Sequence, residues 1–182
     1  MIDPGSRPAP GDLMLVQAFV NTLDVEDDAD SLQRSSDLSA WLAAAGLGAA
    51  DAALDAADLT AAVALRETLR AALRRHHDPA DDVLTLNGPP LRLGFDGDGR
   101  PFVLGDGEGK GAGAGLARLL DIVVTAAAEG TWERLKVCPE QRCQWAFYDA
   151  SRNRSGTWCS MAVCGSRVKM RAYRARQAST SA

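Results

Sequence analysis

The chain has 182 residues, of which 46% are apolar and 24% are charged, which suits one medium domain or a larger domain with a small appendage. This composition excludes a chain that is disordered throughout. No apolar run approaches the roughly 20 residues of a membrane-spanning helix, and no secretory signal is recognisable, so we expect a cytoplasmic protein without membrane contacts.

The charge is distributed unevenly along the chain. Up to Gly130 there are 10 Lys and Arg against 21 Asp and Glu, a net charge of −11, and after Gly130 there are 10 against 3, a net charge of +7. Phosphate backbones attract clustered Lys and Arg and repel acidic groups. The C-terminal part is therefore the candidate nucleic-acid surface.

The first ordered segment is expected to begin at Leu13. Residues 1–12 contain three prolines and two glycines, which predicts a flexible N-terminal arm or an expression remnant. The apolar residues 13–20 predict a short buried helix or strand, and periodicity cannot decide between them at this length. Asn21 and Thr22 follow, either as a polar turn that caps a helix or as part of a ligand pocket.

An acidic stretch and two helices are predicted next. Residues 24–30 lack the ligand spacing of an EF-hand, so a solvated loop is expected. Residues 36–46 predict a short helix with a polar N-cap and a glycine stop. A longer helix is predicted over residues 58–76, with apolar residues on one face. Another face carries Arg66, Arg70 and Arg74, which we interpret as a solvated face, with an interaction surface as the alternative.

The middle of the chain predicts a β hairpin and a further helix. Residues 91–95 and 101–104 flank an Asp-Gly-Asp-Gly turn, which is a typical hairpin signal. The glycine-rich residues 105–115 lack Gly-Lys-Ser/Thr and are expected to be a flexible connector rather than a phosphate loop. An apolar stripe over residues 116–127 predicts a helix that Gly130 ends.

All four cysteines lie in the last third of the chain, as two pairs with four intervening residues each: Cys138 and Cys143, then Cys159 and Cys164. A reducing compartment disfavours disulfides, so these pairs are predicted to be metal ligands. Two close thiolate pairs are a usual ligand set for tetrahedral, structural Zn²⁺. Four thiolates leave no position open for water, and no nucleophile and base can be placed together, so the chain is not predicted to be an enzyme. His76 and His77 are expected to interact with the end of their helix rather than with a metal.

The second cysteine pair is predicted to lie at the start of the last helix. Ser160 is a good N-cap for a helix over residues 161–177, and Cys164 falls on the stripe formed by Met161, Val168, Ala172 and Ala175, which is expected to face inward. A turn that supplies one pair and a helix N-terminus that supplies the other describe a treble-clef-like zinc site.

Basic residues are clustered on the predicted last helix and on the loop before it, and no acidic residue follows Asp149. The members of this cluster are Arg152, Arg154, Arg167, Lys169, Arg171, Arg174 and Arg176. We predict that the cluster contacts DNA, with Arg167, Arg171 and Arg174 reading bases in the major groove. The alternatives are a basic face that docks on the acidic part of this or another subunit, and RNA binding by stacking on nearby aromatic residues, which are Trp145, Phe147, Tyr148 and Trp158.

The predicted fold class is mainly α with a small β hairpin (α+β). The predicted units are a flexible arm (1–12), a mainly helical domain with a hairpin near 91–104 (13–130), a zinc finger with a basic C-terminal helix (131–178) and a tail (179–182).

Several of these motifs resemble known families. The segments Cys138-x4-Cys143, Phe147-Tyr-Asp-Ala-Ser-Arg-Asn153, Trp158-Cys-Ser-Met161 and Cys164-Gly-Ser-Arg167 closely resemble the CGNR zinc finger. Phe19-Val-Asn-Thr22 and Trp41-Leu-Ala-Ala-Ala-Gly46 resemble the ABATE domain that commonly precedes that finger.

The resemblance implies a bacterial transcriptional regulator in which the finger binds DNA and the larger domain senses a small ligand or a stress signal. Asn21 and Thr22 would then be ligand contacts, and a small-molecule effector and a homodimer come into consideration as partners. Ser166 stands where the finger family has asparagine, so the predicted DNA contact there loses the paired donor and acceptor of an amide. Arg167 keeps the charge of the motif.

Overall fold

The computed structural model describes residues 7–49, 52–86, 91–105 and 111–180. The predicted fold class is confirmed, because the chain combines helices with small antiparallel strand pairs. Parts of three predictions lie outside the described residues, namely 1–6 of the arm, 106–110 of the glycine-rich connector and 181–182 of the tail.

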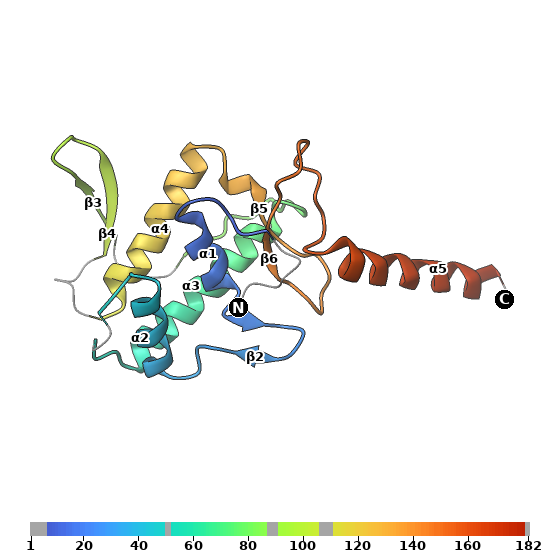
Figure 1. Cartoon of the computed structure of the whole chain (residues 1–182), viewed down its shortest axis with the longest axis horizontal. Helices are drawn as coiled ribbons and strands as arrows, with labels where there is room; N and C mark the ends of the chain where they lie inside the picture. The colour runs from blue at the N-terminus through green and yellow to red at the C-terminus, as the bar shows by residue number, and fades with distance from the viewer. Residues whose placement is uncertain (1–6, 50–51, 87–90, 106–110, 181–182) are drawn as a thin grey trace.

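Figure 1 shows a group of helices with a β hairpin at one end and a long helix that projects from the other. The helices are α1 (Leu13–Val20), α2 (Ser35–Ala44), α3 (Ala56–Arg74), α4 (Gly113–Ala128) and α5 (Ser166–Thr180), with a 3₁₀ turn η1 (Trp132–Arg134) and a π-helical turn η2 (Met161–Gly165). The strand pairs are β1 (Leu23–Asp24) with β2 (Ala29–Asp30), β3 (Leu91–Phe95) with β4 (Pro101–Gly105), and β5 (Leu135–Val137) with β6 (Ala146–Tyr148).

Local signals set several of these boundaries. Residues 13–20, for which the sequence allowed either a helix or a strand, form the helix α1. Gly46 and Gly130 both have a φ of 69° and lie two residues after the last residues of α2 and α4, so the predicted glycine stops are confirmed. The carboxylate of Asp55 accepts hydrogen bonds from the N–H groups of Ala57 and Asp58 and so caps α3. No helix in the described ranges is both long and apolar enough to cross a bilayer.

One hydrophobic core joins the helices to the pair β5–β6. Leu135, Val137 and Ala146 are fully buried in the same cluster as Phe19 of α1 and Leu73 of α3. The cysteines form a second, smaller cluster, which includes Phe147 of β6. The strand pair therefore connects the metal centre directly to the helical part of the chain.

The packed part of the chain begins before Leu13. Ala9 is buried, and its N–H group donates a 2.7 Å hydrogen bond to Oε1 of Gln17. In its described part, residues 7–12, the segment predicted as a flexible arm is thus packed against α1. The prolines that suggested mobility do not prevent an extended segment from lying on a helix.

Arg66 and Arg70 of the arginine stripe on α3 are buried, so the interpretation as a solvated face was wrong for these two residues, whereas Arg74 is exposed. Arg66 forms two hydrogen bonds with the carboxylate of Asp30, at 2.7 and 2.8 Å. Arg70 donates to the carbonyl oxygens of Val20 (2.7 Å) and Gln144 (2.8 Å). Both guanidinium groups are only 2–4% exposed. They can be buried because their N–H groups form hydrogen bonds with the backbone carbonyl oxygens and carboxylates around them.

The acidic stretch forms a hairpin rather than a wholly solvated loop. Asp30 is held by Arg66, and the carboxylate of Asp24 accepts hydrogen bonds from the N–H groups of Glu26 and Asp27. Glu26, Asp27 and Asp28 at the tip are exposed, as the loop prediction required. The hairpin is therefore anchored at its base and presents its charges at its tip.

The last helix does not bury the stripe that was predicted to face inward. After Gly165, α5 leaves the body, and most of its described residues are exposed (Figure 1). Met161 is 59% exposed, and Ala172 and Ala175 are exposed as well. Only Cys164 and Gly165 at the start are buried, so the periodicity of this helix reflects the metal ligand and not a packed face.

Candidate metal centre and nucleic-acid interface

The four cysteine side chains meet at one point. Cys138 follows β5 directly, Cys143 closes the next turn, Cys159 precedes the last helix and Cys164 lies in η2. Their Sγ atoms all lie within 4.8 Å of one another, and all four residues are buried. Two of the separations are 3.5 Å (Cys143 to Cys159) and 3.7 Å (Cys159 to Cys164), far longer than the roughly 2 Å of a disulfide.

These separations fit zinc. Four thiolates at the usual Zn–S distance of about 2.3 Å on a tetrahedron lie roughly 3.8 Å apart. Four sulfur donors with no carboxylate or imidazole among them are typical of a structural site, in which no position is left for a substrate. The predicted ligand set is thus assembled in a form that can hold a structural Zn²⁺ ion.

The pKa values of the four thiols also indicate that a bound cation is needed for all of them to ionise. Hydrogen bonds from Cys143 and Cys159 lower the pKa of Cys138 to about 2. The bond that Cys143 donates to Cys138 raises the pKa of Cys143 to about 12, and the same neighbours raise the pKa of Cys159. One negative charge is therefore stable in the cluster of thiols, and four thiolates require a divalent cation.

Backbone hydrogen bonds shape both cysteine pairs. The N–H of Cys138 donates to the carbonyl oxygen of Trp145 at 2.9 Å, and the N–H of Cys143 donates to that of Glu140 at 2.8 Å, which folds the first pair into a tight turn. At the second pair, Oγ of Ser160 accepts a 3.3 Å hydrogen bond from the N–H of Val163. The predicted N-cap is confirmed, although the turn that it starts is π-helical.

A buried lysine holds the basic loop that contains Arg152 and Arg154. Nζ of Lys136 donates to Oδ2 of Asp149 (2.7 Å), to the carbonyl oxygen of Arg154 (2.7 Å) and to that of Gly156 (3.1 Å). A Cβ atom at Gly156 would lie 2.7 Å from Oδ1 of Asp149, so a side chain does not fit there. The loop has a fixed base and an exposed basic tip.

The same contacts control the ionisation of Asp149. Burial alone would raise the pKa of this carboxyl group, but hydrogen bonds from Lys136, Ser151 and Gly156 lower it well below its usual range. Asp149 is therefore a carboxylate under all ordinary conditions.

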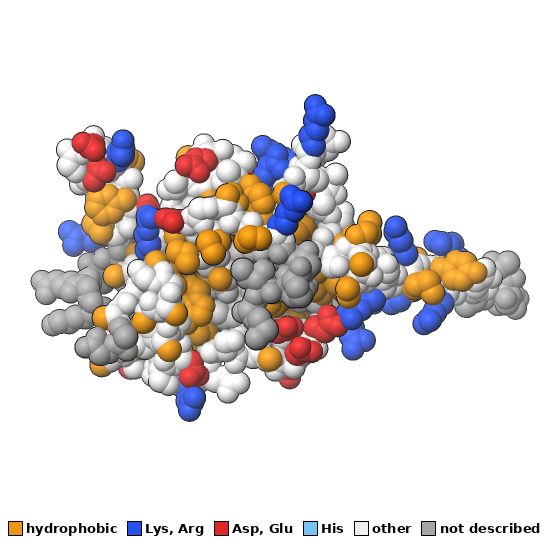
Figure 2. Space-filling model, in the orientation of Figure 1, with side chains coloured by type: hydrophobic (Ala, Val, Ile, Leu, Met, Phe, Trp, Pro, Cys, Tyr) orange, Lys and Arg blue, Asp and Glu red, His pale blue; other side chains and the backbone are white. Residues whose placement is uncertain are grey.

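The predicted DNA contacts on α5 differ in their surroundings. Arg167 forms a 2.6 Å ion pair with Glu26 of the β1–β2 hairpin, and Arg171 forms one with the buried Glu140 of the cysteine turn. Lys169 and Arg174 are exposed and have no ion pair within the described residues. Figure 2 shows Lys and Arg side chains along the projecting helix, with a group of acidic side chains beside its base.

The remaining predicted contacts also have defined positions. Ser166 lies at the first position of α5 and donates a 3.3 Å hydrogen bond to the carbonyl oxygen of Met161, so its hydroxyl contributes to the helix start. Arg176 is exposed near the end of α5. The prediction that all these residues bind DNA stays a prediction.

Asn21 and Thr22 are buried between the helical part and the finger. Asn21 exchanges two hydrogen bonds with the backbone of Ala146, and Thr22 donates one to Phe19 and accepts one from Arg66. These contacts give both residues a structural role, which corresponds to the polar-turn alternative. A ligand contact at these residues stays a prediction.

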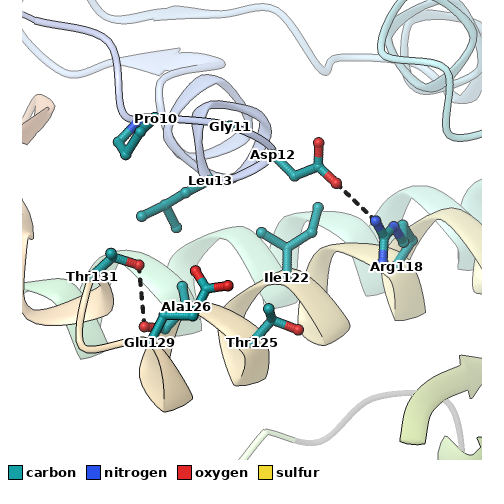
Figure 3. A pocket seen from close by; sticks show the side chains of 10 residues that line it. All are labelled: Pro10, Gly11, Asp12, Leu13, Arg118, Ile122, Thr125, Ala126, Glu129 and Thr131. Carbon is teal, nitrogen blue, oxygen red and sulfur yellow. Dashed lines mark hydrogen bonds and ion pairs between the residues drawn. The ribbon is translucent and has the colours of Figure 1, made fainter. Parts of the chain in front are cut away.

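A hollow of about 420 Å³ lies elsewhere, between the segment before α1 and the outer side of α4 (Figure 3). Leu13, Ile122 and Ala126 provide apolar surface in it. At one end Arg118 forms a 2.7 Å ion pair with Asp12. Sequence reasoning missed this place, because Asp12 and Arg118 are 106 residues apart.

His76 and His77 were expected to interact as cations with the end of α3, and the structure indicates otherwise. Burial lowers the pKa of both side chains, so they are neutral at pH 7. Nδ1 of His76 lies 2.7 Å from the carbonyl oxygen of Leu135, which can only accept, so this nitrogen carries the proton. The ring also contacts Trp132 edge-on, with 5.5 Å between the ring centroids.

A four-thiol centre at the base of a basic helix defines a zinc-finger protein. Residues 134–177 match the family described as the CGNR zinc finger, and residues 13–133 match ABATE, described as "Putative stress-induced transcription regulator". The ABATE match covers more than half of the chain, so the chain belongs to this family and carries a C-terminal CGNR zinc finger. Both are regulator-like rather than enzymatic families. No match was found among curated proteins.

Proposed function

We propose that this protein is a transcription regulator that binds DNA through its zinc finger. The observation that carries the proposal is the exposed basic surface of α5 and the preceding loop, in a part of the chain where no acid follows Asp149. Zinc bound by the four cysteines would fix the start of α5, and Lys136 fixes the preceding loop. The Lys and Arg side chains of both segments are therefore held in defined positions. A helix that stands away from the body can enter a major groove about 12 Å wide.

The isolation of α5 supports a partner of this kind. A helix of 15 residues without a packed face is marginal in water, and its cations repel one another. DNA phosphates along both sides of the helix would relieve this repulsion. We therefore expect the outer turns of α5 to gain order when the protein binds DNA.

The salt dependence of binding to a random DNA duplex tests the proposal. If about five cations neutralise phosphates, a plot of log K against log salt should have a slope of about −4.5. Arg174→Ala should flatten the slope by about 0.9, whereas Arg100→Ala, which removes an exposed cation at the β3–β4 turn, should leave it unchanged. Equal slopes for both variants would refute DNA contact by α5.

Point variants are preferable to removal of the whole finger. A chain that ends after Gly130 would lack Leu135, Val137 and Ala146, which are core residues of the helical part. Its failure to bind DNA would then report unfolding rather than a lost surface. Zinc content and thermal unfolding of each variant provide the necessary control.

We further propose that the N-terminal domain senses a small molecule. The hollow beside α4 is the candidate binding site. It combines an apolar floor with a charged pair at its rim, as ligand sites commonly do. The competing function is a small-molecule-binding protein whose zinc module is purely structural or a protein-docking element. It predicts no DNA binding at low salt by a zinc-loaded, folded protein.

A further inference from the structure

The arginine face of α5 is turned toward carboxylates of its own chain. Arg167 and Arg171 are four residues apart, so their side chains leave the helix on the same side. Arg171 contacts Glu140, which is 3% exposed and belongs to the cysteine turn. Arg167 contacts Glu26, which is 39% exposed and belongs to the tip of the β1–β2 hairpin. Thus 2 of the 3 arginines that were predicted to read bases already have acidic partners.

The hairpin is built to stay in this position. The ion pair between Asp30 and the buried Arg66 fixes its base, and the carboxylate of Asp24 fixes its turn. Arg70, on the same helix as Arg66, donates to the carbonyl oxygen of Gln144 in the cysteine turn. One helix, α3, therefore positions both the acidic hairpin and the finger that the hairpin contacts.

Three carboxylates stand at the tip of this hairpin, those of Glu26, Asp27 and Asp28. Their distance from the base of α5 is short, since Glu26 lies 2.6 Å from Arg167. A phosphate that approaches Arg167 meets the carboxylate of Glu26 on the same guanidinium group and comes within the range of the two other charges, which is about 10 Å at moderate salt. DNA and the hairpin therefore compete for the same guanidinium group.

We propose that the β1–β2 hairpin is an autoinhibitory element that occupies the DNA-reading face of α5 through Glu26. The inference rests on the proposed DNA-binding function. It makes the affinity for DNA depend on the position of a hairpin that belongs to the N-terminal domain, and it thereby connects the two parts of the chain.

The test compares Glu26→Gln with Asp98→Asn in the full, zinc-loaded chain. Both variants remove one exposed negative charge, but Asp98 lies in the turn of the β3–β4 hairpin, away from the finger (Figure 1). In fluorescence anisotropy with a random 20-base-pair duplex at low salt, Glu26→Gln should bind about two- to five-fold more tightly than the wild-type chain. Asp98→Asn should bind like the wild type, and the gain should shrink at high salt.

A second comparison separates the contact from a general effect of charge. In an Arg167→Ala background, Glu26→Gln should bring no further gain, because its partner is absent. Equal affinities of Glu26→Gln and Asp98→Asn, or a gain that persists in full with Arg167→Ala, would overturn the autoinhibitory role while leaving DNA binding intact. If neither the wild type nor Glu26→Gln binds the duplex at low salt, the proposed function itself fails.

Discussion

The side chain of Asn21 and the backbone of Ala146 form a reciprocal pair of hydrogen bonds that joins α1 to β6. Nδ2 of Asn21 donates to the carbonyl oxygen of Ala146 at 2.9 Å, and the N–H of Ala146 donates to Oδ1 of Asn21 at 2.8 Å. Gln17 donates to the same carbonyl oxygen at 3.2 Å. The outer edge of β6 is thus paired with helix side chains in place of another strand.

Loss of this pair should destabilise the protein in the absence of any ligand. Asn21→Ala leaves the buried N–H of Ala146 without a partner, whereas the carbonyl oxygen of Ala146 keeps its hydrogen bond from Gln17. We therefore expect the free energy of unfolding to fall by about 1–3 kcal/mol. Urea unfolding measures the change. Gln33→Ala, which removes an exposed amide from the same domain, should change it by less than about 0.5 kcal/mol. Similar small losses for both variants would contradict the structural role of Asn21.

Removal of zinc should destabilise more than the finger. Metal binding contributes roughly 10–16 kcal/mol to the folding of small zinc peptides, and here β5 and β6 also belong to the main core. We expect chelation to lower the unfolding temperature of the whole chain and to change the near-UV signal of Trp145 and Trp158, which pack against the cysteines.

Cys164→Ser should reproduce the effect of chelation, because it removes one of the four ligands. Metal analysis should find one zinc ion per wild-type chain and markedly less in the variant. If the chelated protein kept the unfolding temperature of the zinc-loaded protein, the metal would not be part of the folded structure.

Lys136 should matter far more for stability than the exposed cations do. The side chains of Lys136 and Asp149 are 6% and 2% exposed, so Lys136→Met leaves a buried carboxylate without its cation, at a cost of about 3–5 kcal/mol. Lys169→Met removes the same charge from an exposed position on α5 and should cost almost nothing. Chemical denaturation of the two variants side by side measures the difference. The expectation is refuted if both variants unfold at the same denaturant concentration.

Much of the finger was predictable from the sequence, because local rules determine it. The spacing of the cysteines predicted that Cys138, Cys143, Cys159 and Cys164 share one site, and Ser160 marked the start of the last helix. Glycine stops identified the ends of α2 and α4, and turn residues identified the β3–β4 hairpin. In each case the residues that make a feature lie close together in the chain.

The features that were missed depend on contacts between distant residues. A stripe of arginines looks the same in sequence whether it faces water or buried carbonyl groups, so the burial of Arg66 and Arg70 could not be read from spacing. The contact between Arg167 and Glu26 joins residues on separate domains. The projection of α5 was also hidden, because its apolar positions follow a helical period although Met170, Ala172 and Ala175 are exposed.

The stability of the protein should fall as the pH drops through the range in which histidine titrates. Burial lowers the pKa of His76 in the folded state, so below the unfolded value of about 6.5 the unfolded chain binds more protons and is favoured. His76→Asn keeps an N–H group for the carbonyl oxygen of Leu135 but does not titrate. The stability of this variant should therefore change less than that of the wild type between about pH 7.5 and 5.5, which is roughly the range in which histidine titrates. Thermal unfolding at several pH values with saturating zinc measures this difference. The pH dependence that remains in the variant is expected from His77, because burial lowers the pKa of that side chain as well. An identical pH profile for the variant and the wild type would show that His76 does not contribute.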